Sequence, residues 1–341
     1  MITILSITEF LETHKSAPIL DVRSAGEYEH GHLLGSISMP LFTDEERSVI
    51  GTLYKHDGRE KAIEKGLEYV GPRMADMVRR ARQIMADGNQ IKLYCWRGGM
   101  RSNSVAWLLH TAGMHVIVLE GGYKSYRRHV LHYLNQSFQF NVLGGYTGSG
   151  KTEILKAMQQ SGAQVVDLES LANHRGSAFG ALCMPAQPST EMFENKLYQH
   201  LIQLNPQKPI WIEDESKNIG KVFLPHNIHA SLKSSQTYFI ICDAEKRREH
   251  LLSLYGEASI HEIQDALERI KKRLGNEAYQ SGCDMLKSKK LDQFCEIVLR
   301  YYDRSYEGLI SKRSAEKVIK IDIPSHWTHN DVAQHLLSQY T

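Results

Sequence analysis

The sequence is short of several features that would assign a protein to a class at once. Its 341 residues contain five cysteines, with no CxxC pair and no zinc-ligand spacing, so neither a disulfide framework nor a zinc site is expected and a reducing compartment is favoured. No apolar run is long enough to span a bilayer, and the N-terminus lacks the basic region of a signal peptide, which predicts a cytoplasmic protein without a membrane partner. The net charge of +2 excludes a uniformly basic nucleic-acid binder, so any such surface must be local.

The chain is longer than one typical hydrophobic core requires, which predicts two domains. Short apolar runs alternate with helical patterns, as expected for an α/β fold with parallel sheets. We place the domains at residues 1–135 and 136–341, because the pattern turns polar after residue 126 and a new strand is expected near residue 138. Within the first domain, one long helical pattern extends over 62–81.

A cysteine loop stands at the centre of the first domain. An apolar run leads into Cys95, glycines follow at positions 98 and 99, and a helical pattern begins after them. Glycine permits backbone angles that turn N–H groups inward, and N–H groups at a helix N-terminus attract anions. A thiol placed there should have a lowered pKa, because these dipoles and Arg97 or Arg101 stabilise its thiolate. We therefore predict that Cys95 is a nucleophile that carries a chalcogen atom, which requires that solvent can reach its side chain.

The spacing of this loop admits two chemistries. Arg101 follows Cys95 by six positions and precedes Ser102, which is the Cys-x5-Arg-Ser signature of cysteine-dependent phosphatases. In those enzymes the arginine grips a phosphate while the thiolate attacks phosphorus. A loop of this length also makes a cradle for another tetrahedral oxyanion, such as selenophosphate. The loop alone does not decide between phosphatase chemistry and chalcogen transfer.

The second domain opens with a phosphate-binding motif. Gly145 to Thr152 matches G-x4-G-K-T, preceded by a strand pattern and followed by a helical one. The backbone N–H groups of such a P-loop hold a diphosphate, its lysine reaches the terminal phosphate, and its threonine binds Mg²⁺. The predicted phosphate-binding residues are Gly145, Gly148, Gly150, Lys151 and Thr152. The motif predicts a di- or triphosphate site and not hydrolysis, since no residue that positions a water is evident.

Carboxylates follow two later strands of this domain. The strand expected over 164–167 ends in Asp167, and the one over 209–212 is followed by Glu213 and Asp214 at a Walker B position. The carboxyl ends of parallel strands meet at one edge of a sheet, where ligands bind. Thr152 and Asp214 are therefore the predicted metal ligands, with Mg²⁺ as the candidate metal. The candidate substrate-binding residues are Asp167, Glu169, His174, Arg175, Glu215 and Ser216.

Basic and aromatic stretches are candidates for contact with RNA. A basic cluster occupies 124–132, a basic run extends from Arg269 to Arg273, and an aromatic and charged stretch follows at 301–306. Basic side chains contact phosphates, and aromatic ones stack on unpaired bases. Solvated helix faces and core packing explain the same residues about as well, so both interpretations stay open.

Both halves contain strings that resemble known families. Asp21-Val22-Arg23 with Glu27-Tyr28 and Gly31-His32 resembles the opening of a rhodanese domain, and the Cys95 loop resembles its active site, over roughly residues 1–132. A rhodanese ordinarily places its arginine five positions after the cysteine, one fewer than here. Taken with the P-loop and the strings at 167–177 and 215–220, the longer loop is similar to that of the tRNA 2-selenouridine synthases, and the likeness extends nearly end to end.

That resemblance implies an activity. The family replaces sulfur by selenium in 2-thiouridine at the wobble position of tRNA, with selenophosphate as the donor, and it transfers a geranyl group from geranyl diphosphate to form an S-geranyl intermediate. It implies tRNA as a partner, a selenophosphate-supplying enzyme as a candidate partner, and Cys95, Arg97 and Arg101 as catalytic residues. The alternatives are a P-loop small-molecule kinase, a cysteine phosphatase with a regulatory partner domain, and a non-catalytic tRNA-binding protein.

Overall fold

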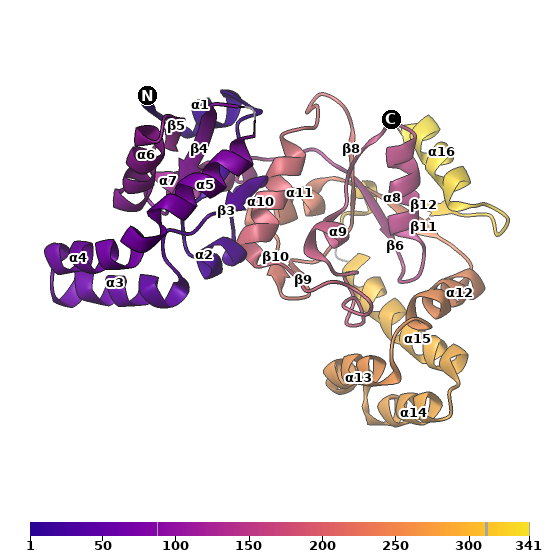
Figure 1. Ribbon diagram of the computed structural model, residues 1–341. Helices are drawn as coiled ribbons and strands as arrows, with labels where there is room; N and C mark the ends of the chain where they lie inside the picture. The colour runs from indigo at the N-terminus through magenta and orange to yellow at the C-terminus, as the bar shows by residue number, and fades with distance from the viewer. Residues whose placement is uncertain (87, 311–312, 341) are drawn as a thin grey trace. The chain divides into compact units, whose positions relative to one another are not determined.

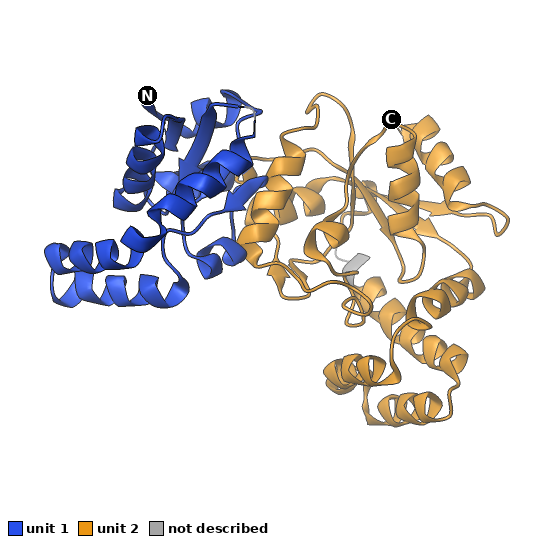
Figure 2. Ribbon diagram, viewed as in Figure 1, with its two compact units in different colours: residues 1–133 blue, residues 134–341 orange. Residues whose placement is uncertain are grey.

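The computed structural model describes residues 1–86, 88–310 and 313–340. It divides the chain into two compact units, Met1–Tyr133 and Leu134–Thr341 (Figure 2), and each unit has its own five-stranded parallel sheet. The predicted α/β class with parallel sheets is thus confirmed. Within the described residues, no helix is long and apolar enough to cross a membrane.

The first unit is a sheet with the strand order β1-β5-β4-β2-β3 and helices packed around it (Figure 1). Its elements in chain order are β1 (Ile2–Leu5), α1 (Ile7–Glu12), β2 (Ile19–Asp21), α2 (Ala25–His30), β3 (Ser36–Ser38), α3 (Asp44–His56), α4 (Arg59–Val70), the 3-10 turn Gly71–Arg73, α5 (Met74–Met85), β4 (Gln90–Tyr94), α6 (Met100–Thr111), β5 (His115–Leu119) and α7 (Gly122–Leu134). The central strand β4 ends directly before Cys95, so the cysteine lies at the carboxyl edge of the sheet, as the pattern of strand, loop and helix predicted.

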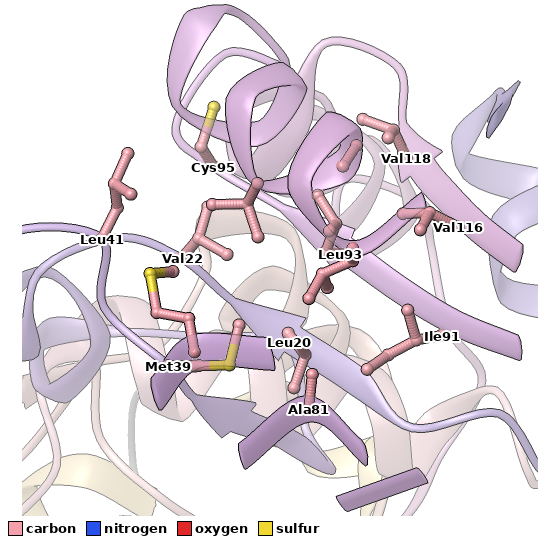
Figure 3. Close-up of a cluster of buried hydrophobic side chains, with 14 of the residues drawn as sticks. Leu20, Val22, Met39, Leu41, Ala81, Ile91, Leu93, Cys95, Val116 and Val118 are labelled. Atoms are coloured by element: carbon pink, nitrogen blue, oxygen red, sulfur yellow. The ribbon is translucent and has the colours of Figure 1, made fainter. Parts of the chain in front are cut away.

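The core of this unit lies under the cysteine loop. Buried apolar side chains from β2, β4 and β5 form one cluster with residues of α5 and α6, which includes Leu20, Ile91, Leu93, Val105, Val116 and Cys95 itself. Figure 3 shows the sulfur of Cys95 at the edge of the cluster, pointing away from Ile91 and Leu93. The strand is therefore held by apolar packing on one side of the cysteine, while the thiol faces the loop.

The single helical pattern predicted over 62–81 is wrong, because the structure has two helices there. The helix α4 ends at Val70, a 3-10 turn covers Gly71–Arg73, and α5 begins at Met74. Pro72 lies in this turn, and proline has no N–H to donate and disfavours a helical residue before it. The apolar spacing correctly predicts helix before and after Pro72, and the proline causes the break between the two helices.

The second unit is a sheet with the strand order β12-β11-β6-β8-β7. Its elements are β6 (Asn141–Gly145), α8 (Lys151–Gln160), β7 (Gln164–Val166), α9 (Leu168–Ala172), α10 (Thr190–Leu201), β8 (Ile210–Glu213), β9 (Asn218–Ile219), β10 (Val222–Phe223), α11 (His226–Ser234), β11 (Gln236–Ile241), α12 (Ala244–Tyr255), α13 (Ile260–Leu274), α14 (Asn276–Lys287), α15 (Leu291–Ile310), the 3-10 turn Ala315–Lys317, β12 (Val318–Asp322) and α16 (His329–Tyr340). The central strand β6 leads into the P-loop, and it begins three residues later than the strand expected from residue 138.

Four helices of this unit form a helical arm, α12–α15, that extends away from the sheet in Figure 1. The arm has an apolar core of its own, in which Leu251, Leu267 and Phe294 are buried together with Phe179 from the loop after α9. The arm is therefore a packed substructure rather than a loose extension.

Candidate active sites

The first candidate site is the cysteine loop between β4 and α6. The Cys95 thiol donates a hydrogen bond to the hydroxyl of Ser102 at 3.2 Å, and that hydroxyl donates to the carbonyl of Gly99 at 3.0 Å. Burial acts to raise the pKa of Cys95, but the Ser102 hydroxyl, the N–H groups of Arg97 and Ser102 and the charge of Arg101 together outweigh it. The pKa of Cys95 consequently lies below its ordinary value, in the direction predicted.

The same loop is more enclosed than expected. Cys95 exposes 2% of its surface, so the requirement that solvent reach its side chain is not met in this conformation. The turn at Gly121 and Gly122 covers one side: the N–H of Tyr123 donates to the carbonyl of Cys95 at 2.8 Å. A Cβ at Gly122 would lie 2.3 Å from that carbonyl oxygen, so only glycine allows this approach.

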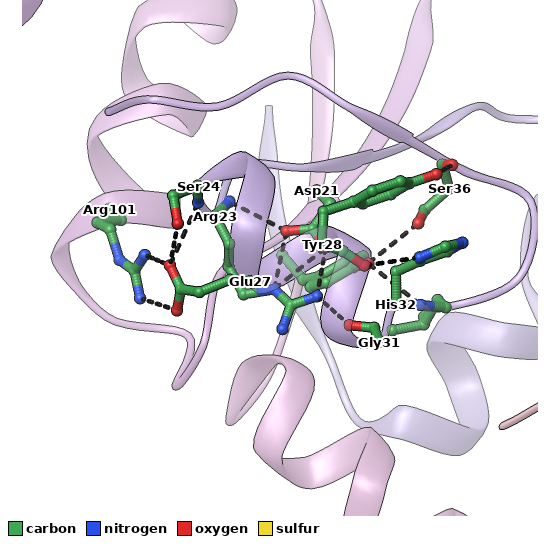
Figure 4. Close-up of polar contacts among 11 residues, drawn as sticks. Asp21, Arg23, Ser24, Glu27, Tyr28, Gly31, His32, Ser36 and Arg101 are labelled. Carbon is green, nitrogen blue, oxygen red and sulfur yellow. Dashed lines mark hydrogen bonds and ion pairs between the residues drawn. The ribbon is translucent and has the colours of Figure 1, made fainter. Parts of the chain in front are cut away.

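The two predicted arginines differ in their surroundings. Arg97 is an exposed residue of the loop itself. Arg101 forms a two-pronged contact with Glu27 at the start of α2, with Nη1–Oε2 at 2.6 Å and Nη2–Oε1 at 3.3 Å (Figure 4). Glu27 also accepts from the N–H of Ser24 as part of a capping box, so one carboxylate serves both the helix and the arginine. An anion that Arg101 is to grip must replace Glu27.

A buried ion pair between Arg23 and Asp21 lies next to the cysteine loop. Arg23 contacts Asp21 with Nη2–Oδ2 at 2.6 Å, donates to the carbonyl of Gly31, and lies 3.9 Å from the ring centre of Tyr123. Figure 4 shows that these contacts link β2 to the turn after α2. The residues that resemble a rhodanese opening therefore hold strands and turns in place and do not reach the thiol.

The second candidate site is the P-loop between β6 and α8. Gly148 and Gly150 adopt positive φ angles of 80° and 73°, which glycine reaches without strain. The ammonium group of Lys151 donates to the carbonyls of Gly145 and Tyr146, at 3.1 and 3.5 Å, and the hydroxyl of Thr152 donates to Glu169 at 3.1 Å. The predicted glycines, lysine and threonine are thus brought together at the carboxyl edge of the sheet.

Carboxylates gather beside Thr152. Glu169 and Glu215 approach the same point, since a Cβ at Gly176 would lie 2.8 Å from an oxygen of one and 2.3 Å from an oxygen of the other. Glu213 accepts from the N–H of Glu169 at 2.7 Å through Oε1, and its buried Oε2 has no hydrogen-bond partner among the described residues. Burial raises the pKa of Glu213 and Glu215 well above the usual range, and the neighbouring carboxylates add to the rise.

The positions of these oxygen atoms show which residues could bind a divalent cation. Asp214 does not join them, because its carboxylate pairs with Arg313 and with Lys233. In the part of the chain that the structure describes, no three His, Cys, Asp or Glu side chains converge on a point that could hold a metal ion. Mg²⁺ needs fewer, since it often binds one or two carboxylates together with substrate phosphates. The hydroxyl of Thr152 and the carboxylate of Glu169 fit that pattern, and Asp214 does not.

The other predicted substrate-binding residues have mainly structural contacts here. Asp167 caps α9 by accepting from the N–H of Ser170 at 2.7 Å, and Ser216 donates to the carbonyl of Asn218 at 2.6 Å. Arg175 donates to the carbonyl of Leu182 at 3.4 Å. His174 is buried, burial lowers its pKa, and its Nδ1 has no partner among the described residues.

Three P-loop neighbours were not predicted from the sequence. Arg247 of α12 donates to the carbonyl of Thr147 at 2.9 Å and pairs with Asp303 of α15. Tyr306 of α15 lies with its ring centre 5.8 Å from the Lys151 ammonium. These residues come from the helical arm, about 100 to 160 positions after the motif; the stretch at 301–306 was noted as a candidate RNA contact, but no local pattern places it or Arg247 beside the P-loop.

The fold and the two loops together define a class of protein: a rhodanese-like domain joined to a P-loop domain. Comparison with family models agrees, since residues 6–129 match the rhodanese-like domain and residues 138–339 match the tRNA 2-selenouridine synthase AAA domain. Relatives that match over most of their length are named tRNA 2-selenouridine synthase. The chain is 32% identical to the tRNA 2-selenouridine synthase of Marinobacter nauticus, covering 89% of this chain and 91% of that one.

Two further relatives are similar over comparable lengths. The tRNA 2-selenouridine synthase of Sulfurovum sp. is 33% identical over 89% of this chain and 91% of its own, and that of Hydrogenovibrio crunogenus is 32% identical over 95% and 96%. This chain therefore belongs to the tRNA 2-selenouridine synthase family, as its resemblance predicted.

Proposed function

We propose that this protein is a tRNA-modifying enzyme that replaces sulfur by selenium in 2-thiouridine at the wobble position. The observation that carries the proposal is that one chain contains both a cysteine loop with a stabilised thiolate and a P-loop, within a family whose named members are tRNA 2-selenouridine synthases. We further propose selenophosphate as the selenium donor and geranyl diphosphate as the activating co-substrate.

The P-loop would act first. A thiocarbonyl sulfur is a poor leaving group, whereas an alkylated sulfur leaves as a thiol. The sulfur of 2-thiouridine attacks C1 of geranyl diphosphate, the C1–O bond breaks, diphosphate departs, and the base loses its N3 proton. Lys151 exchanges its bonds to the carbonyls of Gly145 and Tyr146 for bonds to the departing diphosphate. Thr152 and Glu169 would hold Mg²⁺, which neutralises charge on that diphosphate.

The cysteine loop would act second. Selenium from selenophosphate forms a bond to C2 of the base, the C2–S bond breaks, and geranylthiol leaves, while water takes up the phosphoryl group as phosphate. The Cys95 thiolate attacks the phosphorus of selenophosphate, the P–Se bond breaks, and the released selenide attacks C2, while water later hydrolyses the S–P bond to Cys95; Arg97 and Arg101 hold the phosphate group. This role requires the loop to open, because Cys95 is covered and Arg101 is engaged by Glu27. Arg101 can bind the phosphate group only after that group displaces the Glu27 carboxylate from the guanidinium.

The role of Cys95 is tested with the second half of the reaction alone. Cys95→Ala enzyme is given S-geranylated tRNA and selenophosphate, and 2-selenouridine is measured by mass spectrometry of the nucleosides. We expect the rate to fall roughly 10³-fold or more, as for loss of other nucleophiles. Cys183→Ala, which removes an exposed thiol, is the matched control and should keep full activity. Undiminished product from Cys95→Ala would remove Cys95 from the mechanism.

The role of the P-loop is tested in the same way. We expect Lys151→Ala to slow geranylation roughly 10²- to 10³-fold while selenation of pre-geranylated tRNA continues. Lys156→Ala, on the exposed face of the same helix, is the control. Equal loss of both activities would mean that Lys151 is structural or binds RNA. ATP turnover with a small acceptor would instead favour a kinase, and hydrolysis of an aryl phosphate would favour a phosphatase.

A further inference from the structure

The helical arm carries a groove that neither candidate site uses. The groove has a volume of about 740 Å³ and lies among the end of α13, the length of α14 and one face of α15. Its residues on α15 are spaced three and four positions apart, from Gln293 through Ile297 and Arg300 to Arg304, so they share one side of that helix. The groove is therefore a continuous feature of the packed arm.

The charged side chains of the groove favour an anionic occupant. Arg273, Arg300 and Arg304 line it, and neither Arg273 nor Arg304 has an ion-pair partner among the described residues. Of the two acids in the lining, Glu296 pairs with Arg248 at 3.1 Å and with Arg300 at 3.9 Å, which leaves Glu277 opposite the two unpaired arginines. A lining with more cations than unpaired anions attracts phosphates.

The remaining surface of the groove suits flat, apolar groups. Tyr301 is half-buried at the groove and is held by an edge contact with Tyr302, at 5.0 Å between ring centres. Leu274, Met285 and Ile297 supply apolar surface around it. Unpaired bases stack on aromatic and apolar side chains while arginines contact their phosphates, and a paired helix would not enter a groove of this size.

The groove also leads toward the P-loop. Its lining ends at Arg304 and Ser305, and the next residue, Tyr306, lies beside the Lys151 ammonium. Arg304 and Tyr306 are on different sides of α15, so the two places are separated by about one helix diameter, roughly 10 Å. A nucleotide chain seated in the groove would thus have its neighbouring nucleotides close to the phosphate-binding loop.

We propose that this groove binds an unpaired segment of the RNA substrate, with Tyr301 stacking on a base and Arg273, Arg300 and Arg304 contacting phosphates. The inference rests on the proposed function, because it takes tRNA as the substrate, and it assigns the surface of the protein that holds it. Residues of the basic run from Arg269 to Arg273 then have different roles. Arg273 lines the groove, whereas Lys271 pairs with Glu268 at 3.3 Å.

The test compares tRNA binding by two charge-matched variants of the full chain. Arg273→Gln/Arg304→Gln removes two groove cations, and Lys287→Gln/Lys290→Gln removes two exposed cations of the same arm outside the groove. We expect the groove variant to bind tRNA roughly tenfold more weakly and to reduce the slope of log Kd against log salt by about 1.4, while the control changes neither appreciably. Equal weakening of both variants would mean a general charge effect and would overturn the proposal.

Stacking is tested separately with Tyr301. Tyr301→Ala should weaken tRNA binding roughly 5- to 150-fold, and Tyr301→Phe should restore it, because the ring and not the hydroxyl stacks. Weakening by both variants alike, or by neither, would contradict the assigned role.

The same samples separate this inference from the proposed function. Wild-type protein is assayed for 2-selenouridine by mass spectrometry in parallel. Selenonucleoside formation with no difference between groove and control variants would refute the groove and leave the function intact. A specific loss of binding in the groove variant without any selenonucleoside from the wild type would support the groove and refute the function.

Discussion

Replacing Ser102 by alanine should make the Cys95 thiol a weaker acid. The Ser102 hydroxyl lies 3.2 Å from Sγ and can turn from the carbonyl of Gly99 to donate to the thiolate, and it is the largest of the influences that lower the pKa of Cys95. A hydrogen bond to a charged group contributes about 1.5 to 3 kcal/mol, and 1.36 kcal/mol corresponds to a change of 1 in pKa. We therefore expect Ser102→Ala to raise the pKa of Cys95 by about 1 to 2.

The assay is the pH dependence of alkylation by iodoacetamide, followed at the Cys95 peptide by mass spectrometry. The absolute rate depends on how often the covered loop opens, but the midpoint of the pH profile gives the pKa of the Cys95 thiol. Ser102→Thr retains a hydroxyl and should keep the wild-type midpoint. An unchanged midpoint in Ser102→Ala would refute the assigned stabilisation. If Cys95 fails to react at any pH while the exposed Cys183 does, the loop does not open and the nucleophilic role of Cys95 is refuted.

Two further predictions concern stability. Gly122→Ala should lower the free energy of unfolding, measured by chemical denaturation, by at least about 3 kcal/mol, because the added carbon meets the Cys95 carbonyl at 2.3 Å. The control is Gly35→Ala, also at positive φ but with nothing within 4 Å of the added carbon, which should cost only about 1 to 2 kcal/mol. Similar losses in the two variants would contradict the close packing at Gly122. The pKa of Glu215 is raised by burial, so the folded chain holds this proton to higher pH than the unfolded chain does, and the stabilisation present below about pH 4.5 is lost as pH rises. Glu215→Gln should therefore flatten the fall in Tm between pH 5 and pH 8, while Glu257→Gln on the surface should not, and parallel profiles for all three proteins would refute the shift.

Local signals predicted the two loops well. The apolar run before Cys95 and the glycines after it produce β4, a loop and α6, and the P-loop motif is found between β6 and α8. Each of these features depends on residues that are adjacent in the sequence, so the sequence pattern contains the information needed. In both loops, glycines allow the tight turns, and the helix N-terminus that follows supplies backbone N–H donors.

Contacts between distant residues escaped prediction. Glu27 holds Arg101 across 74 positions, and Gly122 closes the cysteine loop from a turn after β5. The string at 27 was read as part of a rhodanese opening, and its capping box predicts only a helix start. Asp214 was predicted as a metal ligand because it follows a strand. In the structure its carboxylate pairs with Arg313 and Lys233, and Glu169 is the carboxylate that contacts Thr152. Such pairings depend on how elements pack, which spacing does not encode.

Arg247 has a consequence for how this protein can be re-engineered. It joins the P-loop carbonyl of Thr147 to Asp303, which lies in the part of α15 next to the P-loop, and a Cβ at Gly148 would meet the Arg247 backbone. A chimaera that exchanges part of the arm must therefore carry the residues at 247 and 303 as one pair, and any exchanged P-loop must keep glycine at 148. Exchanging α12 or α15 alone would leave the buried guanidinium of Arg247 without its carboxylate, however well each piece folds by itself.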